Sequence, residues 1–539
     1  MDKYDEIIDG LTLEDLCGQV ICYDRSVLCN CSRAEMKRII NETRPGGVFV
    51  YDSSKEEVKK YSSEINSVTK IPVIIATDAE HGPGGPLRDQ EVLPQPMAWG
   101  ACDDEELIER AGIVTAESCR KNGIQWSFAP LVDINYNPNN PGGNIRTVSD
   151  SPKHVAKIAG AYMRGIQKGG YMAASCKHFP GDGTDDRNQH FCTLINSKSR
   201  EEWMETYGFV YREMINQGLL SVMVAHIALP AFQENEYDEV LGYKPATLSR
   251  VLITDLLKGE LGFEGCVVSD AMCMVGACSM VDPDMLAVEF LRAGGDMVLF
   301  ALPTDFYSIK KAVETGYLPI ERLKDAVKRI LKLKEGVHLF GNQEEFEGSI
   351  ELSEPVKKVA CEIAEKSINV IRNADGIFPL NLKPNAKILM CNLQAEEETV
   401  NSYLLTTLRD ELIARGFFVE MLQNPGHRLI ESELAKEYDA ILINCRMSCK
   451  DYCGGSLRVD WKQIALFWRG QILKHPRVIF TSFGDPYKLY EYPFVRTYIN
   501  TFSNTPATQR AFVRTLVGEI PAVGKSPVEL KGFFERTVE

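Results

Sequence analysis

The chain has 539 residues, 44% of them hydrophobic and 25% charged, a length and composition that predict a soluble protein of two or three domains. Its formal net charge of −15 argues against a nucleic-acid-binding surface, because neutralising phosphates requires an excess of Lys and Arg. We therefore expect no nucleic-acid partner.

The start of the chain and its cysteines bear on its compartment. The first residues, MDKYDEIIDG, lack the apolar core of a secretory signal, and apolar windows such as LLSVMVAHIALPAF are too short to span a bilayer. The 16 cysteines are then typical of reduced thiols. These features predict a cytoplasmic protein without a membrane partner. A homodimer is left open, since no sequence feature reports on the oligomeric state.

The first two thirds of the chain alternate apolar runs with amphipathic segments such as LITDLLKGELGF. Nearly continuous apolar character is typical of strands covered on both faces. The runs are GGVFVYD, IPVIIATD, WSFAPLVD, YMAASCKH, LLSVMVAH, GCVVSD and GDMVLF. Strand–helix alternation repeated about eight times predicts an α/β fold, a (β/α)8 TIM-like barrel, as a catalytic domain over residues 1–340.

Several of these runs end in a polar residue. The residues are Asp78, Asp133, His178, His226 and Asp270. The ends of parallel barrel strands converge on one rim, where enzymes of this fold keep their chemistry. Any single one could cap a helix or satisfy a loop, but together they predict an active-site rim.

The character of the chain changes near residue 340. FGNQEEFEGSIELSEP is polar, acidic and aperiodic, and predicts a linker over residues 341–360. Beyond it, AKILMCNL, GFFVEML, YDAILINC and RVIFTSFG alternate with helical patterns. They predict a smaller open α/β domain over residues 361–539.

Metal and nucleotide chemistry find little support. No phosphate-binding G-x-x-x-x-G-K-[ST], dinucleotide-binding G-x-G-x-x-G or H-E-x-x-H is present. The spacing of His178 and His190 across a Gly-Pro loop is not a recognisable ligand pattern. Cys445, Cys449 and Cys453 recur every fourth residue, but three thiolates without a nearby His are a weak set, so we interpret them as structural. We expect neither a metal nor a cofactor.

What remains is Asp270 and the loop KHFPGDGTDDRNQHF, residues 177–191, which is crowded with ionisable groups. A carboxylate together with a nearby group that donates a proton is what glycosidic cleavage requires. A His can be that group, because its ordinary pKa of about 6.5 lets it donate and then accept a proton near neutrality.

The loop KHFPGDGTDDRNQH resembles the signature K-H-F-P-G-H-G-x4-D-x-H of glycoside hydrolase family 3, in its β-N-acetylhexosaminidase branch. Further segments are similar to the family's opening helix, rim strands and C-terminal domain. They are LTLEDLCGQVI, IPVIIATDAEHG, FAPLVDINYNPNNP, GFEGCVVSDAM, VIFTSFGDPYKL and LVGEIPAVGKSPVEL. The resemblance implies a retaining, exo-acting β-glycosidase that hydrolyses terminal β-N-acetylhexosaminides, with a carbohydrate as its partner.

The resemblance also implies residue roles. Asp270 would be the nucleophile that forms a covalent glycosyl-enzyme, and His190 the acid/base on a mobile loop, next to Asn188. Lys177 and Arg146 would donate charge-assisted bonds to the sugar. The full set expected to bind substrate is Asp78, Arg146, Lys177, His178, Arg88, Asp133 and His226, with Asp133 acting behind the cations or only structurally.

Three positions depart from the family pattern. Asn188 replaces an Asp that orients the His, so orientation survives through the amide oxygen but His190 should be a weaker base. Asp185 or Asp186 could supply the missing charge, although we interpret both as a solvated loop face. Asp182 replaces the His of G-H-G, which should alter how the loop docks.

The third departure is the stretch EHGPGGPLR, which replaces the family's EGG-R-V run. Arg88 lies two residues late in it and is therefore only a candidate ligand. Three alternatives stay open: another sugar specificity, a catalytically silent sugar-binding homologue suggested by Asn188, and a phosphorylase. A His repels phosphate less than a carboxylate does, which is why phosphate can be the acceptor.

Overall fold

The computed structural model describes residues 3–67, 69–278, 280–394, 404–434, 436–446, 459 and 461–539. Cys449 and Cys453 of the four-residue cysteine repeat lie outside the described residues. In the described part, no helix has the length and apolar character needed to cross a membrane.

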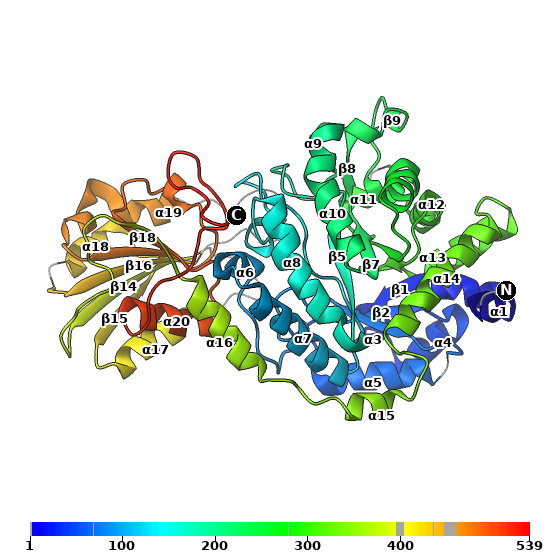
Figure 1. Cartoon of the computed structure of the whole chain (residues 1–539), viewed down its shortest axis with the longest axis horizontal. Helices are drawn as coiled ribbons and strands as arrows, with labels where there is room; N and C mark the ends of the chain where they lie inside the picture. The colour runs from blue at the N-terminus through cyan, green and yellow to red at the C-terminus, as the bar shows by residue number, and fades with distance from the viewer. Residues whose placement is uncertain are drawn as a thin grey trace.

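An eight-stranded parallel barrel forms the larger part of the molecule (Figure 1). Its strands, in sheet order, are β1 (Ile21–Asp24), β2 (Gly47–Phe49), β3 (Ile74–Thr77), β4 (Trp126–Ser127), β5 (Ala173–Phe179), β7 (Ser221–Val224), β11 (Cys266–Ser269) and β12 (Val298–Leu299). Strand β12 pairs with β1, and a parallel bridge from Val268 to Met297 completes the ring. The predicted α/β barrel is confirmed.

Helices cover the outside of the barrel (Figure 1). They include α2 (Leu13–Gln19), α4 (Arg33–Thr43), α5 (Lys55–Asn66), α6 (Pro96–Cys102), α7 (Glu105–Lys121), α8 (Pro152–Gln167), α9 (Arg200–Glu205), α10 (Tyr207–Asn216), the π-helix η5 (Val251–Glu260), α12 (Leu286–Ala293), α13 (Pro303–Glu314) and α14 (Ile320–Gly336). Reciprocal Ser–Glu capping boxes begin α5 and α9, which explains why these helices start where they do. Residues of β3, β5, β7 and β11 are buried throughout, as expected for strands covered on both sides.

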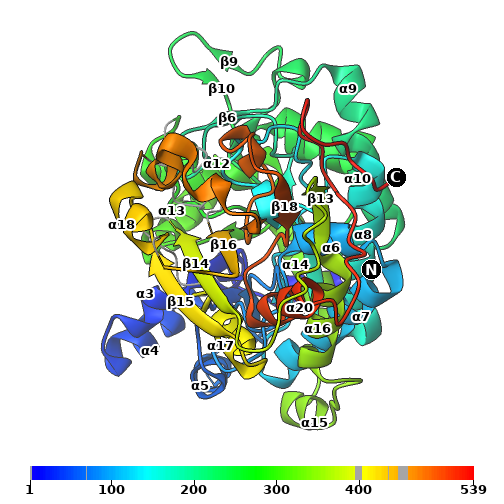
Figure 2. The ribbon, with the colours of Figure 1, turned by 90° about the vertical axis from the view of Figure 1, so that its left-hand side faces the viewer.

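A second, smaller sheet follows. Its order is β13 (Asn369–Asn373), β18 (Thr497–Asn500), β17 (Val478–Ser482), β16 (Ala440–Cys445), β14 (Lys387–Leu393) and β15 (Phe418–Gln423), with only β13 antiparallel to its neighbour. Helices α16 (Val356–Ser367), α17 (Thr406–Ala414) and α20 (Pro506–Leu516) cover one face, and α18 (His427–Glu433) and α19 (Trp461–Ile464) lie on the other (Figures 1 and 2). The predicted second α/β unit is therefore present.

The segment between the two sheets has its own structure. Part of the stretch expected to be a linker, residues 341–360, forms α15 (Gln343–Gly348) and the start of α16. Arg110 of the barrel pairs with Glu354 and Glu362 in this region, at 2.6 and 2.9 Å. The end of the chain returns to the barrel, where Arg536 pairs with Asp150 at 2.6 Å. The domain boundaries at 340 and 361 stay a prediction.

Candidate active site

A row of ion pairs joins the ends of β3 and β5 to the loop after β4. The Nζ atom of Lys177 lies 2.7 Å from Asp78 Oδ1 and 2.7 Å from Glu80 Oε1. Arg146 forks onto Glu80 through Nε and Nη2, at 2.9 and 2.7 Å. The side chains of Lys177 and Glu80 are 4% and 9% exposed, whereas those of Asp78 and Arg146 are 32% and 19% exposed. The buried pair thus supports the two members that face solvent.

The pKa values of the two carboxylates in this row are shifted in opposite directions. Burial raises the pKa of Asp78 above its ordinary value, and Lys177 only partly offsets that effect. Burial also acts on Glu80, but Arg146 and Lys177 outweigh it and hold the pKa of Glu80 well below its usual range. Asp78 is therefore the member of the row that gains most from hydrogen-bond donors supplied by a ligand.

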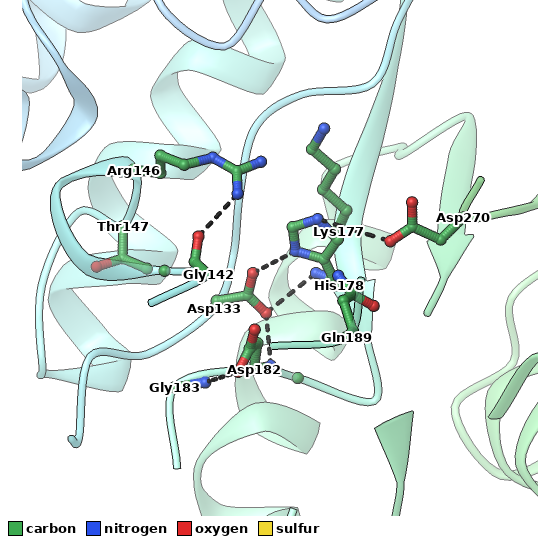
Figure 3. Close-up of polar contacts among 12 residues, drawn as sticks. Asp133, Gly142, Arg146, Thr147, Lys177, His178, Asp182, Gly183, Gln189 and Asp270 are labelled. Atoms are coloured by element: carbon green, nitrogen blue, oxygen red, sulfur yellow. Dashed lines mark hydrogen bonds and ion pairs between the residues drawn. The ribbon is translucent and has the colours of Figure 1, made fainter. Parts of the chain in front are cut away.

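The ring of His178 lies between two carboxylates (Figure 3). Its Nδ1 atom lies 2.7 Å from Asp133 Oδ2, and its Nε2 atom lies 3.9 Å from Asp270 Oδ2. Burial opposes the charged ring, but Asp133 outweighs it and raises the pKa of His178. Asp133 therefore supports His178 and not Lys177 or Arg146, which is where we expected its contact.

Asp270 comes directly after β11, at the mouth of the barrel. Its Oδ1 atom accepts a 2.7 Å bond from the amide of Ala271, while its buried Oδ2 atom has no hydrogen-bond partner within the described part of the chain. Burial alone would raise the pKa of Asp270, but His178, His226 and Lys177 together hold it below its usual value. The site thus keeps an ionised carboxylate with one oxygen unused, as a nucleophile needs.

The loop that carries His190 docks onto the turn after Asp270. The amide of Val275 donates to the His190 carbonyl at 3.1 Å, and Thr193 Oγ1 donates to the Gly276 carbonyl at 2.9 Å. A Cβ atom on Gly276 would lie 2.5 Å from the Gln189 carbonyl oxygen, so this contact needs a glycine. The loop and the chain after Asp270 are held together by these contacts.

Asn188 orients the imidazole of His190. Its Oδ1 atom accepts from the His190 backbone amide at 3.0 Å and lies 2.6 Å from His190 Nδ1. An atom that accepts from a backbone N–H is the amide oxygen, so Nδ1 carries the hydrogen in this contact. The orientation expected of the family's Asp is kept, without its charge.

Two residues expected to bind substrate, His226 and Arg88, have polar contacts within the protein. Both ring nitrogens of His226 are used by the protein, with Nδ1 3.1 Å from Thr247 Oγ1 and Nε2 3.0 Å from the Ala271 carbonyl, and the residue is fully buried. Arg88 pairs with Glu57 at 2.8 Å and Asp52 at 3.4 Å, beside β2. Their expected role in substrate binding stays a prediction.

The acidic loop residues differ from each other. Asp186 is exposed, as expected, but the side chain of Asp185 is only 9% exposed. Its Oδ2 atom accepts from the Ile195 amide at 2.9 Å, and it pairs with Arg187 at 2.5 Å. Asp185 therefore closes the base of the loop and is not a solvated residue.

Glu80 is a residue of the site that we did not predict individually. It links Lys177 to Arg146, and its only signal in the sequence was its place in TDAEHG, two residues after a rim Asp.

Among the described residues no group of three His, Cys, Asp or Glu side chains could hold a metal ion.

Barrel enzymes carry their catalytic groups on the rim of a parallel barrel. Here that rim holds a buried carboxylate with one unpartnered oxygen, beside a histidine whose pKa is raised, a combination typical of an active site. Residues 12–333 match the glycosyl hydrolase family 3 N-terminal domain, and the chain belongs to this family of glycoside hydrolases.

Two comparisons extend over most of the chain. A protein of Cellulomonas fimi named beta-N-acetylglucosaminidase/beta-glucosidase is 30% identical over 499 residues, covering 90% of this chain and 88% of that protein. A solved beta-N-acetylglucosaminidase from Paenibacillus sp. str. FPU-7 superposes with a TM-score of 0.82 at 26% identity, covering 97% of this chain and 99% of the other.

A third comparison bears on the acceptor. The solved structure of a beta-glucoside phosphorylase superposes with a TM-score of 0.86 at 29% identity, covering 98% of this chain and 95% of the other.

Proposed function

We propose that this chain is a retaining, exo-acting β-glycosidase that hydrolyses terminal β-N-acetylhexosaminides, in particular β-N-acetylglucosaminides. The observation that carries the proposal is the unused Oδ2 atom of Asp270, buried and ionised, on the rim where the His190 loop docks. The names of the Cellulomonas fimi and Paenibacillus relatives support the choice of sugar.

The mechanism follows from these two residues. Asp270 Oδ2 attacks the anomeric carbon, forming a covalent glycosyl-enzyme as the glycosidic carbon–oxygen bond breaks. The imidazolium of His190 gives its Nε2 proton to the leaving oxygen. In the second step a water oxygen bonds to the anomeric carbon, the bond from that carbon to Asp270 Oδ2 breaks, and the neutral ring takes the proton of the water. Because Asn188 accepts from Nδ1, the exchange of protons takes place at Nε2. Two displacements return the original configuration.

The ion-pair row would bind the sugar. Asp78 accepts hydrogen bonds from sugar hydroxyl groups, and Arg146 donates charge-assisted hydrogen bonds from the opposite end of the row. Lys177 and Glu80 hold both in place from below. His226 would act through the Ala271 carbonyl, beside the nucleophile, as a positioning residue and not as a ligand.

A panel of nitrophenyl glycosides tests the sugar. We expect turnover of the β-N-acetylglucosaminide at least about tenfold above the β-glucoside, because a site built to hydrogen-bond a substrate group rejects analogues that lack it. Equal or higher turnover of the β-glucoside would replace the sugar in this proposal with glucose.

A second candidate function is phosphorolysis. Its support is the likeness to a beta-glucoside phosphorylase over nearly the whole chain, together with an acid/base loop in which Asn188 adds no negative charge next to His190. The same panel with inorganic phosphate separates the two, because a phosphorylase releases the sugar 1-phosphate and a hydrolase the free sugar.

The compartment belongs to this proposal as well. We propose a cytoplasmic enzyme, because each described cysteine is a free thiol, as is usual in a reducing compartment.

A further inference from the structure

Two loops meet above the rim, and a buried pair of side chains joins them. The first loop follows β4 and carries Arg146; the second follows β5 and carries His190. Asp182, at the start of the second loop, is 3% exposed, and Asn140, in the first, is fully buried. Asp182 is also the position at which this chain departs from the G-H-G of the family signature.

The amide of Asn140 contacts both loops. Its Nδ2 atom donates to Asp182 Oδ1 at 2.7 Å and to the Asp185 carbonyl at 2.8 Å. Its Oδ1 atom accepts from the Gly143 amide at 2.6 Å, within the turn that leads to Arg146. We call the contact between Asn140 and Asp182 the amide–carboxylate bridge.

Asp182 is also tied to the site beneath it. Its backbone amide donates to Asp133 Oδ1 at 2.7 Å, the same atom that accepts from the amide of His178 at 3.0 Å (Figure 3). Burial and the nearby Asp133 raise the pKa of Asp182 to about 6. Burying the carboxylate of Asp182 near that of Asp133 costs free energy of folding. If Asp182 served only to shape the turn, an uncharged side chain would do so at a lower cost.

We propose that Asp182 and Asn140 are positioning residues, whose bridge sets the loop of His190 against the loop of Arg146 so that both reach one bound sugar. The inference rests on the proposed function for the roles of these two residues. The bridge also affects a property that does not depend on catalysis, namely how easily the second loop is cut by a protease. Arg187 lies on that loop with a side chain that is 46% exposed, so it is a site at which trypsin can report on opening of the loop.

Three variants test the bridge. Asn140→Asp places two carboxylates face to face, Asp182→Asn keeps an acceptor for Asn140, and the double variant restores an amide opposite a carboxylate. We expect kcat/KM on nitrophenyl β-N-acetylglucosaminide to fall about thirtyfold in Asn140→Asp and no more than about threefold in Asp182→Asn. The double variant should recover part of the thirtyfold loss, because the charge repulsion is relieved but the bond from position 140 to the Asp185 carbonyl stays lost.

A second readout does not depend on activity. Trypsin should cut after Arg187 about tenfold faster in Asn140→Asp than in the wild type, because local opening sets the rate of cleavage. The double variant should reverse part of this increase, since the bond to the Asp185 carbonyl is not restored. The matched control is Asn196→Asp, which alters another buried amide that donates to the Gly181 carbonyl at 2.9 Å without touching Asp182. Adding Asp182→Asn should not rescue it.

The outcomes separate the two claims. If the wild-type protein has no glycosidase activity but the variants show the expected trypsin pattern, the proposed function is wrong and the amide–carboxylate bridge is supported. Single-variant effects that multiply in the double variant, or rescue of Asn196→Asp by Asp182→Asn, overturn the bridge. If Asn140→Asp does not fold, Asn140→Ala replaces it: faster cleavage after Arg187 supports the bridge, and unchanged cleavage overturns it.

Discussion

The Nε2 atom of His178 lies 3.9 Å from the Oδ2 atom of Asp270, close enough for attraction but beyond a hydrogen bond. His178 therefore favours the ionised carboxylate without occupying the oxygen that attacks carbon. Asp133 holds the other side of the ring at 2.7 Å, so the charge next to Asp270 has a fixed position.

Removing the carboxylate of Asp270 should abolish turnover. We expect Asp270→Ala to lower kcat on nitrophenyl β-N-acetylglucosaminide by at least about a thousandfold, because the variant lacks the carboxylate oxygen that would attack the anomeric carbon. The control is Asp284→Ala, at an exposed position, which should leave kcat unchanged. If Asp270→Ala keeps the kcat of the wild type, Asp270 is not the nucleophile.

Loss of the charge behind His178 should appear in stability. Burial lowers the pKa of His178 and Asp133 raises it, with a net rise, so folding favours the protonated ring. That stabilisation is complete below the unfolded-state pKa of about 6.5 and is lost as the pH rises through the raised folded-state value. The Tm difference between wild type and Asp133→Asn should therefore be larger at about pH 6 than at about pH 9. A difference that grows with pH would refute the assignment.

Restoring the family's carboxylate should strengthen His190 as a base. Asn188→Asp places a negative charge at an oxygen that now lies 2.6 Å from Nδ1. We expect the alkaline limb of the kcat/KM profile to move up by about one pH unit, since a nearby opposite charge favours the imidazolium. If the parent is inactive and only Asn188→Asp turns over substrate, the parent is a silent homologue.

Docking of the loop should depend on Gly276. A Cβ atom there would meet the carbonyl oxygens of Gln189 at 2.5 Å and Cys192 at 2.9 Å, which forces the loop away from Asp270. We expect Gly276→Ala to lower kcat/KM by about a hundredfold, a cost typical of a displacement of about 1 Å in a catalytic group. Gly348→Ala is the control, because nothing lies within 4 Å of its added Cβ. Equal effects of the two would show that the docking contact is unimportant.

Much of the fold followed from the sequence because buried parallel strands are continuous apolar runs. Strand β1 was not predicted, because it has only four residues and begins two residues after α2. Its first residue, Ile21, is also the last residue of the stretch that resembles the family's opening helix. In the second sheet β13 and β18 were also missed. Strand β13 has a mixed burial pattern with an exposed last residue, and β18 begins with Thr497 and ends with Asn500, so neither forms a continuous apolar run.

Within the site, sequence alone could place residues on a rim but not choose their partners. Asp133 was expected behind Lys177 and Arg146, yet it binds His178, since that choice depends on how β4 and β5 are staggered. The backbone amide of Arg88 donates to Ser53, which carries its side chain towards β2. Such long-range contacts leave no local pattern in the chain.

The most direct test is to trap the glycosyl-enzyme. His190→Ala should slow deglycosylation more than glycosylation when the leaving group is good, so a dinitrophenyl β-N-acetylglucosaminide should accumulate the intermediate. Peptide mass spectrometry after an acid quench should then find one N-acetylhexosaminyl group on Asp270. A group attached to any other residue, or rapid turnover with an inverted product and no attached sugar, would contradict the account.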